Sequence, residues 1–307
     1  QVYDELQLVH RLEVRQLGLV TRVNHRLEGR LDARRHATAE NRLLLFARRP
    51  APIQVSWLGY PNTTGMRAMD YRLVDAVVEP PGIADERSVE RVVRLPHGFH
   101  CYEPPDDAPA VTRLPAAGSG TVTFGSFNDL KKIQPAVIRS WARIMQRVPG
   151  SRLWLKCSSF GDAPTRELYA EAFERHGIAR DRLTMIPRVS STREHLELYG
   201  RIDIALDSFP YNGTTTTCEA LWMGVPVVTL WGDRHASRVS ASLLGRVELD
   251  DWVAQDAEGY EELAVSRASR LEELAALRAG LRERVAASPL CDPRRITRSI
   301  ERAYPQM

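Results

Sequence analysis

The chain has 307 residues, of which 43% are hydrophobic and 26% charged, so it is long enough for two domains and has a globular rather than a disordered composition. Its formal net charge of +3 comes from 42 basic and 39 acidic residues that are scattered along the chain, which argues against a nucleic-acid partner. No apolar run reaches the roughly 18 residues of a membrane-spanning helix, and no signal peptide is recognisable. Four widely spaced cysteines without a CxxC pair indicate reduced thiols rather than a metal site, so we expect a cytoplasmic protein without a membrane partner.

The first part of the chain is weakly patterned. Residues 1–40 are atypical and rich in arginine, and the chain starts with Gln rather than Met, so we expect a piece of a longer protein. Two short strands are predicted after Pro50, over 53–58 and 73–78, each followed by a loop rich in Gly or Pro. The proline-rich segment 101–120 predicts a linker, and residues 1–115 are therefore expected to form a partial N-terminal lobe.

Strand and helix patterns then alternate regularly. Strands are predicted over 121–127, 152–157, 183–186, 202–206 and 225–230, and helices over 135–148, 165–176, 193–199 and 216–223. This alternation predicts a parallel sheet covered on both faces. Further helical patterns follow over 257–287 and 297–303, so we expect an α/β lobe over 116–290 and a C-terminal helix over 291–307.

The stretch 203–230 carries the strongest chemical signal. A buried strand ends in a Pro-Tyr-Asn-Gly turn, and a helix starts among four threonines. The first turn of a helix has unpaired N–H groups and a positive dipole end, which favour a phosphate. The alternative is one threonine as a simple cap, but β-branched residues in a row are otherwise a poor start for a helix. We therefore expect phosphate binding at Gly213, Thr214, Thr215 and Thr216, with Glu219 one turn further in suited to ribose hydroxyls.

Two further side chains are candidates beside this loop. Lys132 follows the first strand of the same lobe, where an ammonium would neutralise a diphosphate leaving group; the alternative is a solvated surface lysine. His195 lies near the start of a helix, and its alternative roles are a cap or a surface group. No Asp-x-Asp pair occurs to hold a bridging cation, so no metal cofactor is expected.

Several motifs together resemble the protein O-GlcNAc transferase (SPINDLY) family, glycosyltransferase family 41, of bacterial type. They are the segment 50–65, Met69-Asp-Tyr71, Leu95-Pro-His97, Phe127-Asn128 with Lys132, Glu194-His195 and the segment 211–226. The resemblance covers about residues 41–307 and implies a GT-B-like α/β fold, with a complete Rossmann-like C-terminal lobe and an incomplete N-terminal one. It also implies metal-independent, inverting transfer of N-acetylglucosamine from UDP-GlcNAc to Ser or Thr of an acceptor protein.

The resemblance also assigns roles to single residues. Lys132 is the catalytic residue that would hold the diphosphate and assist its departure. The implied donor-binding residues are Leu58, Gly59, Asn128, His195, Gly213, Thr214, Thr215, Thr216 and Glu219. Within this set the threonines would bind phosphate, Glu219 the ribose and His195 the uridine portion, and Leu58 and Gly59 would face the sugar.

The chain also departs from the family pattern. An Asp-Phe-x-x-His motif of the first lobe is missing, Ala37 replaces a histidine or tyrosine, and upstream tetratricopeptide repeats are not seen. An N-terminal truncation and a reading-frame error are both open explanations. Three functions therefore stay open: the O-GlcNAc transferase, a catalytically incomplete UDP-binding module, and a relative that uses GDP-fucose or UDP-glucose.

Overall fold

The computed structural model describes residues 43–307, so the expectations for residues 1–40, including Ala37, lie outside the described part. The chain forms two compact units. The N-terminal unit comprises the described residues up to Cys101 together with Arg234–Ala236 and Asp292–Met307, and the C-terminal unit comprises Tyr102–Asp233 and Ser237–Cys291. The chain thus divides after Cys101 rather than at residue 115, and the last helix belongs to the N-terminal unit.

The N-terminal unit contains a small parallel sheet. Its elements are α4 (Leu43–Ala47), β1 (Val55–Trp57), β2 (Tyr71–Val74), α5 (Ile83–Arg87), β3 (Arg91–Arg94) and α14 (Pro293–Ala303). The three strands pair in the order β1-β2-β3, and both pairs are parallel. The first predicted strand is present but shorter, the second lies over Tyr71–Val74 and overlaps its predicted range of 73–78 by two residues, and β3 was not predicted. Helix α14 begins where Asp292 accepts a hydrogen bond from the N–H of Arg295.

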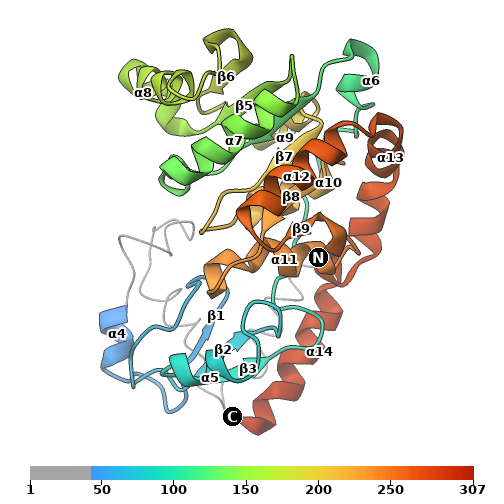
Figure 1. The fold of residues 1–307 in the computed structure, drawn as a ribbon. Coiled ribbons are helices and arrows are strands. Elements are labelled where there is room, and N and C mark those ends of the chain that lie inside the picture. Colours follow the sequence, from blue (N-terminus) through green and yellow to red (C-terminus); the bar gives the residue numbers. More distant parts are fainter. Residues whose placement is uncertain (1–42) are drawn as a thin grey trace. The chain divides into compact units, whose positions relative to one another are not determined.

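The C-terminal unit is larger and alternates strand and helix (Figure 1). Its strands are β4 (Thr123–Ser126), β5 (Arg152–Lys156), β6 (Leu183–Ile186), β7 (Ile204–Leu206), β8 (Val227–Leu230) and β9 (Val253–Ala254). Its helices are α6 (Pro115–Ser119), α7 (Pro135–Arg147), α8 (Ala163–Glu174), α9 (Thr192–Tyr199), α10 (Thr215–Trp222), α11 (Val239–Gly245), α12 (Ala257–Ala268) and α13 (Leu271–Ala287).

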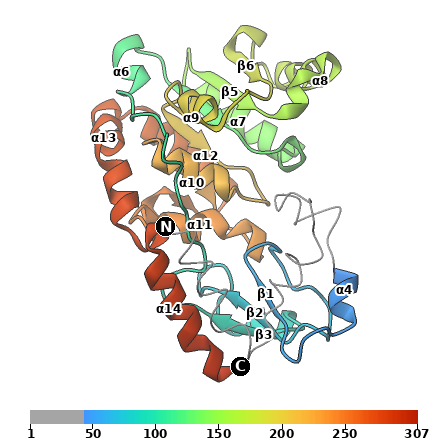
Figure 2. The same cartoon turned by 180° about the vertical axis from the view of Figure 1, so that it is seen from behind.

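All strands of this second sheet are parallel, as predicted, and they lie in the order β6-β5-β4-β7-β8-β9. The chain therefore starts in the middle of the sheet, runs outward to β6, and returns to continue from β7 on the other side. Because β–α–β crossovers are right-handed, this reversal places the crossover helices of the two halves on opposite faces, whereas α12, which follows the last strand, packs beside α7. Figure 1 shows α7 and α12 on one face, and Figure 2 shows the face that carries α9 and α10.

Local signals explain where the main helices begin. Asp162, Ser191 and Asp256 each accept a hydrogen bond from a backbone N–H in the first turn of α8, α9 and α12. Helix α7 has Pro at its first position, where the missing N–H costs nothing. Its apolar face is fully buried, and its Trp141 Nε1–H donates to the hydroxyl of Tyr260 on α12 at 3.0 Å.

Two predictions in this unit were wrong. The segment predicted as a linker contains the short helix α6, and its Thr112 carbonyl accepts from the Arg278 guanidinium at 2.8 Å. The continuous helical pattern over 257–287 divides into α12 and α13. No Gly or Pro marks the break between them, so composition alone did not predict it.

No helix within residues 43–307 is both long and apolar enough to cross a lipid bilayer.

Candidate functional site

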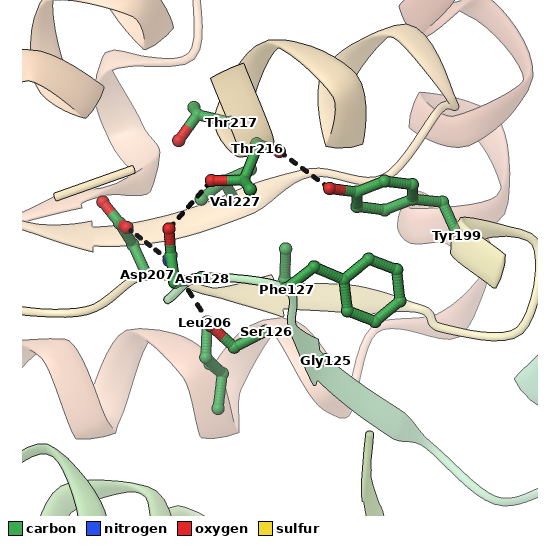
Figure 3. A pocket seen from close by; sticks show the side chains of 11 residues that line it. Gly125, Ser126, Phe127, Asn128, Tyr199, Leu206, Asp207, Thr216, Thr217 and Val227 are labelled. Atoms are coloured by element: carbon green, nitrogen blue, oxygen red, sulfur yellow. Dashed lines mark hydrogen bonds between the residues drawn. The ribbon is translucent and has the colours of Figure 1, made fainter. Parts of the chain in front are cut away.

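The strand order creates a candidate site at the carboxyl ends of β4 and β7. These strands are neighbours, but the chain leaves β4 toward one edge of the sheet and leaves β7 toward the other. Loops that diverge in this way open the crevice in which parallel α/β sheets bind ligands. A small pocket lies at this point (Figure 3). It is lined by Gly125, Ser126, Phe127, Asn128, Tyr199, Ala205, Leu206, Asp207, Thr216, Thr217 and Val227.

Asn128 joins the two loops. Its side-chain Nδ2 donates to Asp207 Oδ1 at 3.3 Å, and its Oδ1 accepts from the Thr216 hydroxyl at 2.8 Å. Figure 3 shows Asn128 between these two residues. The loop after β4 and the first turn of α10 are therefore held together before any ligand binds.

Gly213 lies in close contact with these groups. Its N–H donates to Asp207 Oδ1 at 2.7 Å. A Cβ at this position would lie 2.6 Å from Thr217 Oγ1 and 2.7 Å from Thr216 Oγ1. The sequence-based argument for Gly213 was close approach of a ligand; the structure adds that its own neighbours leave no room for a side chain.

Helix α10 differs from α8, α9 and α12 at its N-terminus. No side chain within the described residues caps it, although it starts among threonines. Its first-turn N–H groups have no acceptor inside the helix, and the positive end of the helix dipole lies there. Thr215 is exposed, Thr214 and Thr216 are half-buried, and Thr217 is buried with its hydroxyl 2.9 Å from Ser240 Oγ. This arrangement suits an anion at the start of α10.

Lys132 reaches the same loop from the β4 side. Its Nζ donates to the carbonyl of Asn212 at 2.7 Å and lies 4.1 Å from the centroid of the Tyr211 ring. Burial lowers the pKa of Lys132, while the carboxylates of Asp207 and Asp129 oppose that shift. An ammonium uses three donors, so the contact with Asn212 leaves others for a ligand.

A second group of side chains lies on the α9 side of α10. His195 Nε2 is 3.0 Å from Glu219 Oε2, and Tyr199 donates to the Thr216 carbonyl at 3.2 Å and to Glu219 at 3.4 Å. The Phe127 ring lies 4.5 Å from the Tyr199 ring and 5.7 Å from His195, measured between centroids. Within the described residues His195 Nδ1 is buried without a hydrogen-bond partner. A carboxylate beside aromatic rings suits a ribose and its base.

Leu58 and Gly59 belong to the N-terminal unit. Leu58 is 47% exposed and has a φ of 68°, and the Gly59 N–H donates to the Trp57 carbonyl at 2.9 Å. The loop that follows is anchored on buried Glu90, which accepts hydrogen bonds from Thr63 Oγ1 and Thr64 N, both at 2.6 Å. A leucine in the left-handed region is a strained conformation of the kind found at functional sites.

Some residues of the site were not predicted. Tyr199 lies one turn after His195 on α9, and this helical spacing was the available signal. Asp207 ends the buried strand of the 203–230 stretch, and Tyr211 lies in its turn, but nothing local distinguishes them. Only the contacts with Asn128 and Lys132, about eighty positions away in the chain, identify them.

Comparisons with known proteins agree with the predicted family. A profile described as "Glycosyl transferase family 41" matches residues 35–105 and 109–300. A protein of Solanum lycopersicum described as "Probable UDP-N-acetylglucosamine--peptide N-acetylglucosaminyltransferase SPINDLY" is 47% identical over 270 residues, which cover 88% of this chain and 29% of that protein. An Arabidopsis thaliana protein with the same description, named SEC rather than SPINDLY, is 34% identical over 274 residues, 86% of this chain and 27% of that protein. The chain thus spans less than a third of the length of these curated relatives.

Solved structures agree on the fold. A mutant O-GlcNAc transferase of Thermobaculum terrenum superposes with a TM-score of 0.79 at 41% identity, over 86% of this chain and 50% of that one. A sucrose-phosphate synthase of Thermosynechococcus elongatus has a TM-score of 0.50 at 19% identity, over 78% of this chain and 58% of that one, which shows likeness of fold alone. The predicted α/β, GT-B-like fold class is confirmed.

Proposed function

The chain belongs to glycosyl transferase family 41, and we propose that its C-terminal unit binds the nucleoside-diphosphate sugar donor UDP-GlcNAc. The observation that carries this proposal is that Lys132 contacts the loop 207–214, which leads directly into the uncapped N-terminus of α10. The ammonium and the helix N-terminus both create positive potential at this loop, which favours a diphosphate. The relatives' names support the choice of UDP-GlcNAc as donor.

In this proposal each part of the donor has its own partners. The diphosphate is bound by Lys132 and by the first-turn N–H groups of α10, with Thr215 and Thr216 adding hydroxyls. Glu219 accepts from the ribose hydroxyls, because one of its oxygens has no contact with His195. His195 contacts the uridine portion. Leu58 and Gly59 of the N-terminal unit are proposed to face the sugar.

We further propose that the transfer is inverting and needs no metal ion. The hydroxyl oxygen of an acceptor Ser or Thr attacks the anomeric carbon of N-acetylglucosamine, the bond from that carbon to the diphosphate oxygen breaks, and the hydroxyl proton passes to solvent or to the leaving diphosphate. The negative charge that develops on the leaving diphosphate is stabilised by the Lys132 ammonium and by the N-terminus of α10, which take the place of a metal ion. Donors held in position before the reaction stabilise this charge without reorganisation.

Titration calorimetry with UDP, GDP and UDP-GlcNAc tests donor binding. We expect UDP to bind, and Lys132→Ala to weaken it by about tenfold or more, since a hydrogen bond to a charged group contributes about 1.5–3 kcal/mol. Lys131→Ala is the matched control, because Lys131 is the exposed neighbour in the same turn. Equal UDP affinity in the two variants would contradict the role of Lys132. Preferential binding of GDP would show that the donor is a GDP-sugar and not UDP-GlcNAc.

A peptide-glycosylation assay with UDP-GlcNAc tests transfer separately. We expect N-acetylglucosamine to be incorporated at Ser or Thr of an acceptor peptide. Binding of UDP-GlcNAc without incorporation would instead make this chain a donor-binding module.

A further inference from the structure

Asp207 lines the pocket of the candidate site, is almost fully buried, and accepts hydrogen bonds from several groups around it. Only 2% of its surface is exposed. Its Oδ1 accepts from the N–H groups of Ser208 at 2.9 Å and Gly213 at 2.7 Å, and its Oδ2 accepts from the Thr229 hydroxyl at 2.8 Å. Asn128 Nδ2 adds a longer contact to Oδ1 at 3.3 Å.

These donors come from three separate segments. Gly213 belongs to the loop after β7, Thr229 to the neighbouring strand β8, and Asn128 to the loop after β4. Asp207 therefore holds one loop against the strand beside it and against the loop on its other side. Asp207 is the acceptor for the Gly213 N–H, and Asn128 Nδ2 has a second, longer contact with Ser126 Oγ at 3.4 Å.

The hydrogen bond to Asp207 also decides how the Asn128 amide is oriented. Because Nδ2 faces Asp207, Oδ1 faces α10 and accepts from the Thr216 hydroxyl. On the opposite side, Gly213 is fixed next to Asn212, whose carbonyl accepts from Lys132. The start of α10 is thus connected to Asp207 through Asn128, and Lys132 is connected to it through Gly213 and Asn212.

A carboxylate suits this position, since Ser208, Gly213, Thr229 and Asn128 all donate to it. An ionised carboxylate accepts at both oxygens, whereas an amide would either turn its N–H groups toward the N–H groups of Ser208 and Gly213 or lose the acceptor for the Thr229 hydroxyl. Burial raises the pKa of Asp207, and hydrogen bonds from Ser240, Gly213 and Thr229 together with the charge of Lys132 oppose that rise. The protein thus keeps a costly buried carboxyl group at this position.

We propose that Asp207 is a positioning residue whose carboxylate holds the Gly213 loop and Asn128 in the arrangement that binds a diphosphate. This inference rests on the proposed function and deepens it, because it names the group that organises the phosphate part of the site. It predicts a selective effect: loss of Asp207 weakens binding of the diphosphate and leaves binding of the nucleoside almost unchanged.

The test compares UDP with uridine, and GDP with guanosine, by titration calorimetry on Asp207→Asn. We expect affinity for the diphosphate to fall by about tenfold more than affinity for the nucleoside, as for the loss of one or two well-placed hydrogen bonds. Asp203→Asn is the matched control. Asp203 is also buried, lies at the other end of β7, and accepts from the N–H groups of Ala116 at 2.9 Å and Thr123 at 2.8 Å. It should lower stability without changing the ratio of the two affinities.

Thr229→Val is the second variant, for the case in which Asp207→Asn does not fold. It removes only the donor on β8, and we expect a loss of about threefold in diphosphate affinity with nucleoside affinity unchanged. The proposal is wrong if the folded Asp207→Asn protein, or in its absence Thr229→Val, keeps the wild-type ratio. Should the wild-type protein bind neither UDP nor GDP, the proposed function fails as well; should it bind one of them and only the ratio stay constant, this inference alone fails.

Discussion

Gly213→Ala tests how closely the phosphate loop is packed on α10. The added Cβ would lie 2.6 Å from Thr217 Oγ1, 2.7 Å from Thr216 Oγ1 and 3.2 Å from Asn128 Oδ1, whereas ordinary contact begins at 3.4 Å. Both hydroxyl groups must therefore move. Thr217 is hydrogen-bonded to Ser240 at 2.9 Å and Thr216 to Asn128 at 2.8 Å, so movement breaks or stretches two hydrogen bonds.

The magnitude follows from these contacts. Each hydrogen bond contributes about 1 kcal/mol to stability, and overpacking adds roughly 1–3 kcal/mol. We expect the free energy of unfolding of the C-terminal unit to fall by about 3–5 kcal/mol if both hydrogen bonds are lost. Because Thr216 is displaced at the start of α10, UDP affinity should also fall, by about tenfold for a loss near 1.4 kcal/mol.

Urea denaturation and UDP titration measure the two effects. Gly161→Ala is the matched control, because a Cβ at Gly161 meets nothing within 4 Å. If both variants unfold at the same urea concentration and bind UDP equally well, then Gly213 is not confined in the way that the distances indicate.

Two further predictions concern stability alone. Gly280→Ala in α13 should raise the free energy of unfolding by about 0.5–1 kcal/mol, since a helix-interior glycine costs this much and the new Cβ meets nothing within 4 Å; a fall in the urea midpoint would contradict it. Burial lowers the pKa of His100 from 6.5 to about 4, so between these values the unfolded chain binds a proton that the folded one does not. Stability should therefore fall as the pH is lowered through this window, by about 3 kcal/mol at most, and His100→Asn should show a flatter pH dependence in the same urea titrations. Equal slopes for the two proteins would count against a neutral His100 in the folded protein.

The sequence predicted those elements whose signals are local. Strand β6 has the predicted ends, and α7 differs from its prediction by one residue, because an apolar helix face and a proline at the start are visible in a short window. Strand β9 has only two residues, too few for alternation to register. Strand β3 has the sequence Arg-Val-Val-Arg and is apolar only at its two central residues, so it was not recognised as a strand. Its Arg94 forms an ion pair with Asp85 of α5, a contact that the sequence pattern does not reveal.

The candidate site shows the same division between local and distant information. The threonines at the start of α10 and Lys132 after β4 were found because a helix start and a strand end are local features. Their proximity could not be predicted, since alternation of strands and helices specifies parallel pairing but not that β4 lies beside β7. The same holds for Asp207, whose importance depends on donors from three segments.

Lys132 shows why this organisation matters for binding. A free lysine side chain loses up to about 2 kcal/mol of conformational entropy when it is fixed, and a ligand that orders it must overcome that cost. Here the Asn212 carbonyl at 2.7 Å and the Tyr211 ring at 4.1 Å already hold the ammonium, and half-burial removes part of its hydration. The Lys132 side chain therefore loses this conformational entropy on folding and not on ligand binding, because it contacts a loop that Asp207 fixes through Gly213. In the proposed function, a diphosphate then meets a charged donor whose position and remaining N–H groups are set in advance, so charge that develops on the leaving group is stabilised without reorganisation.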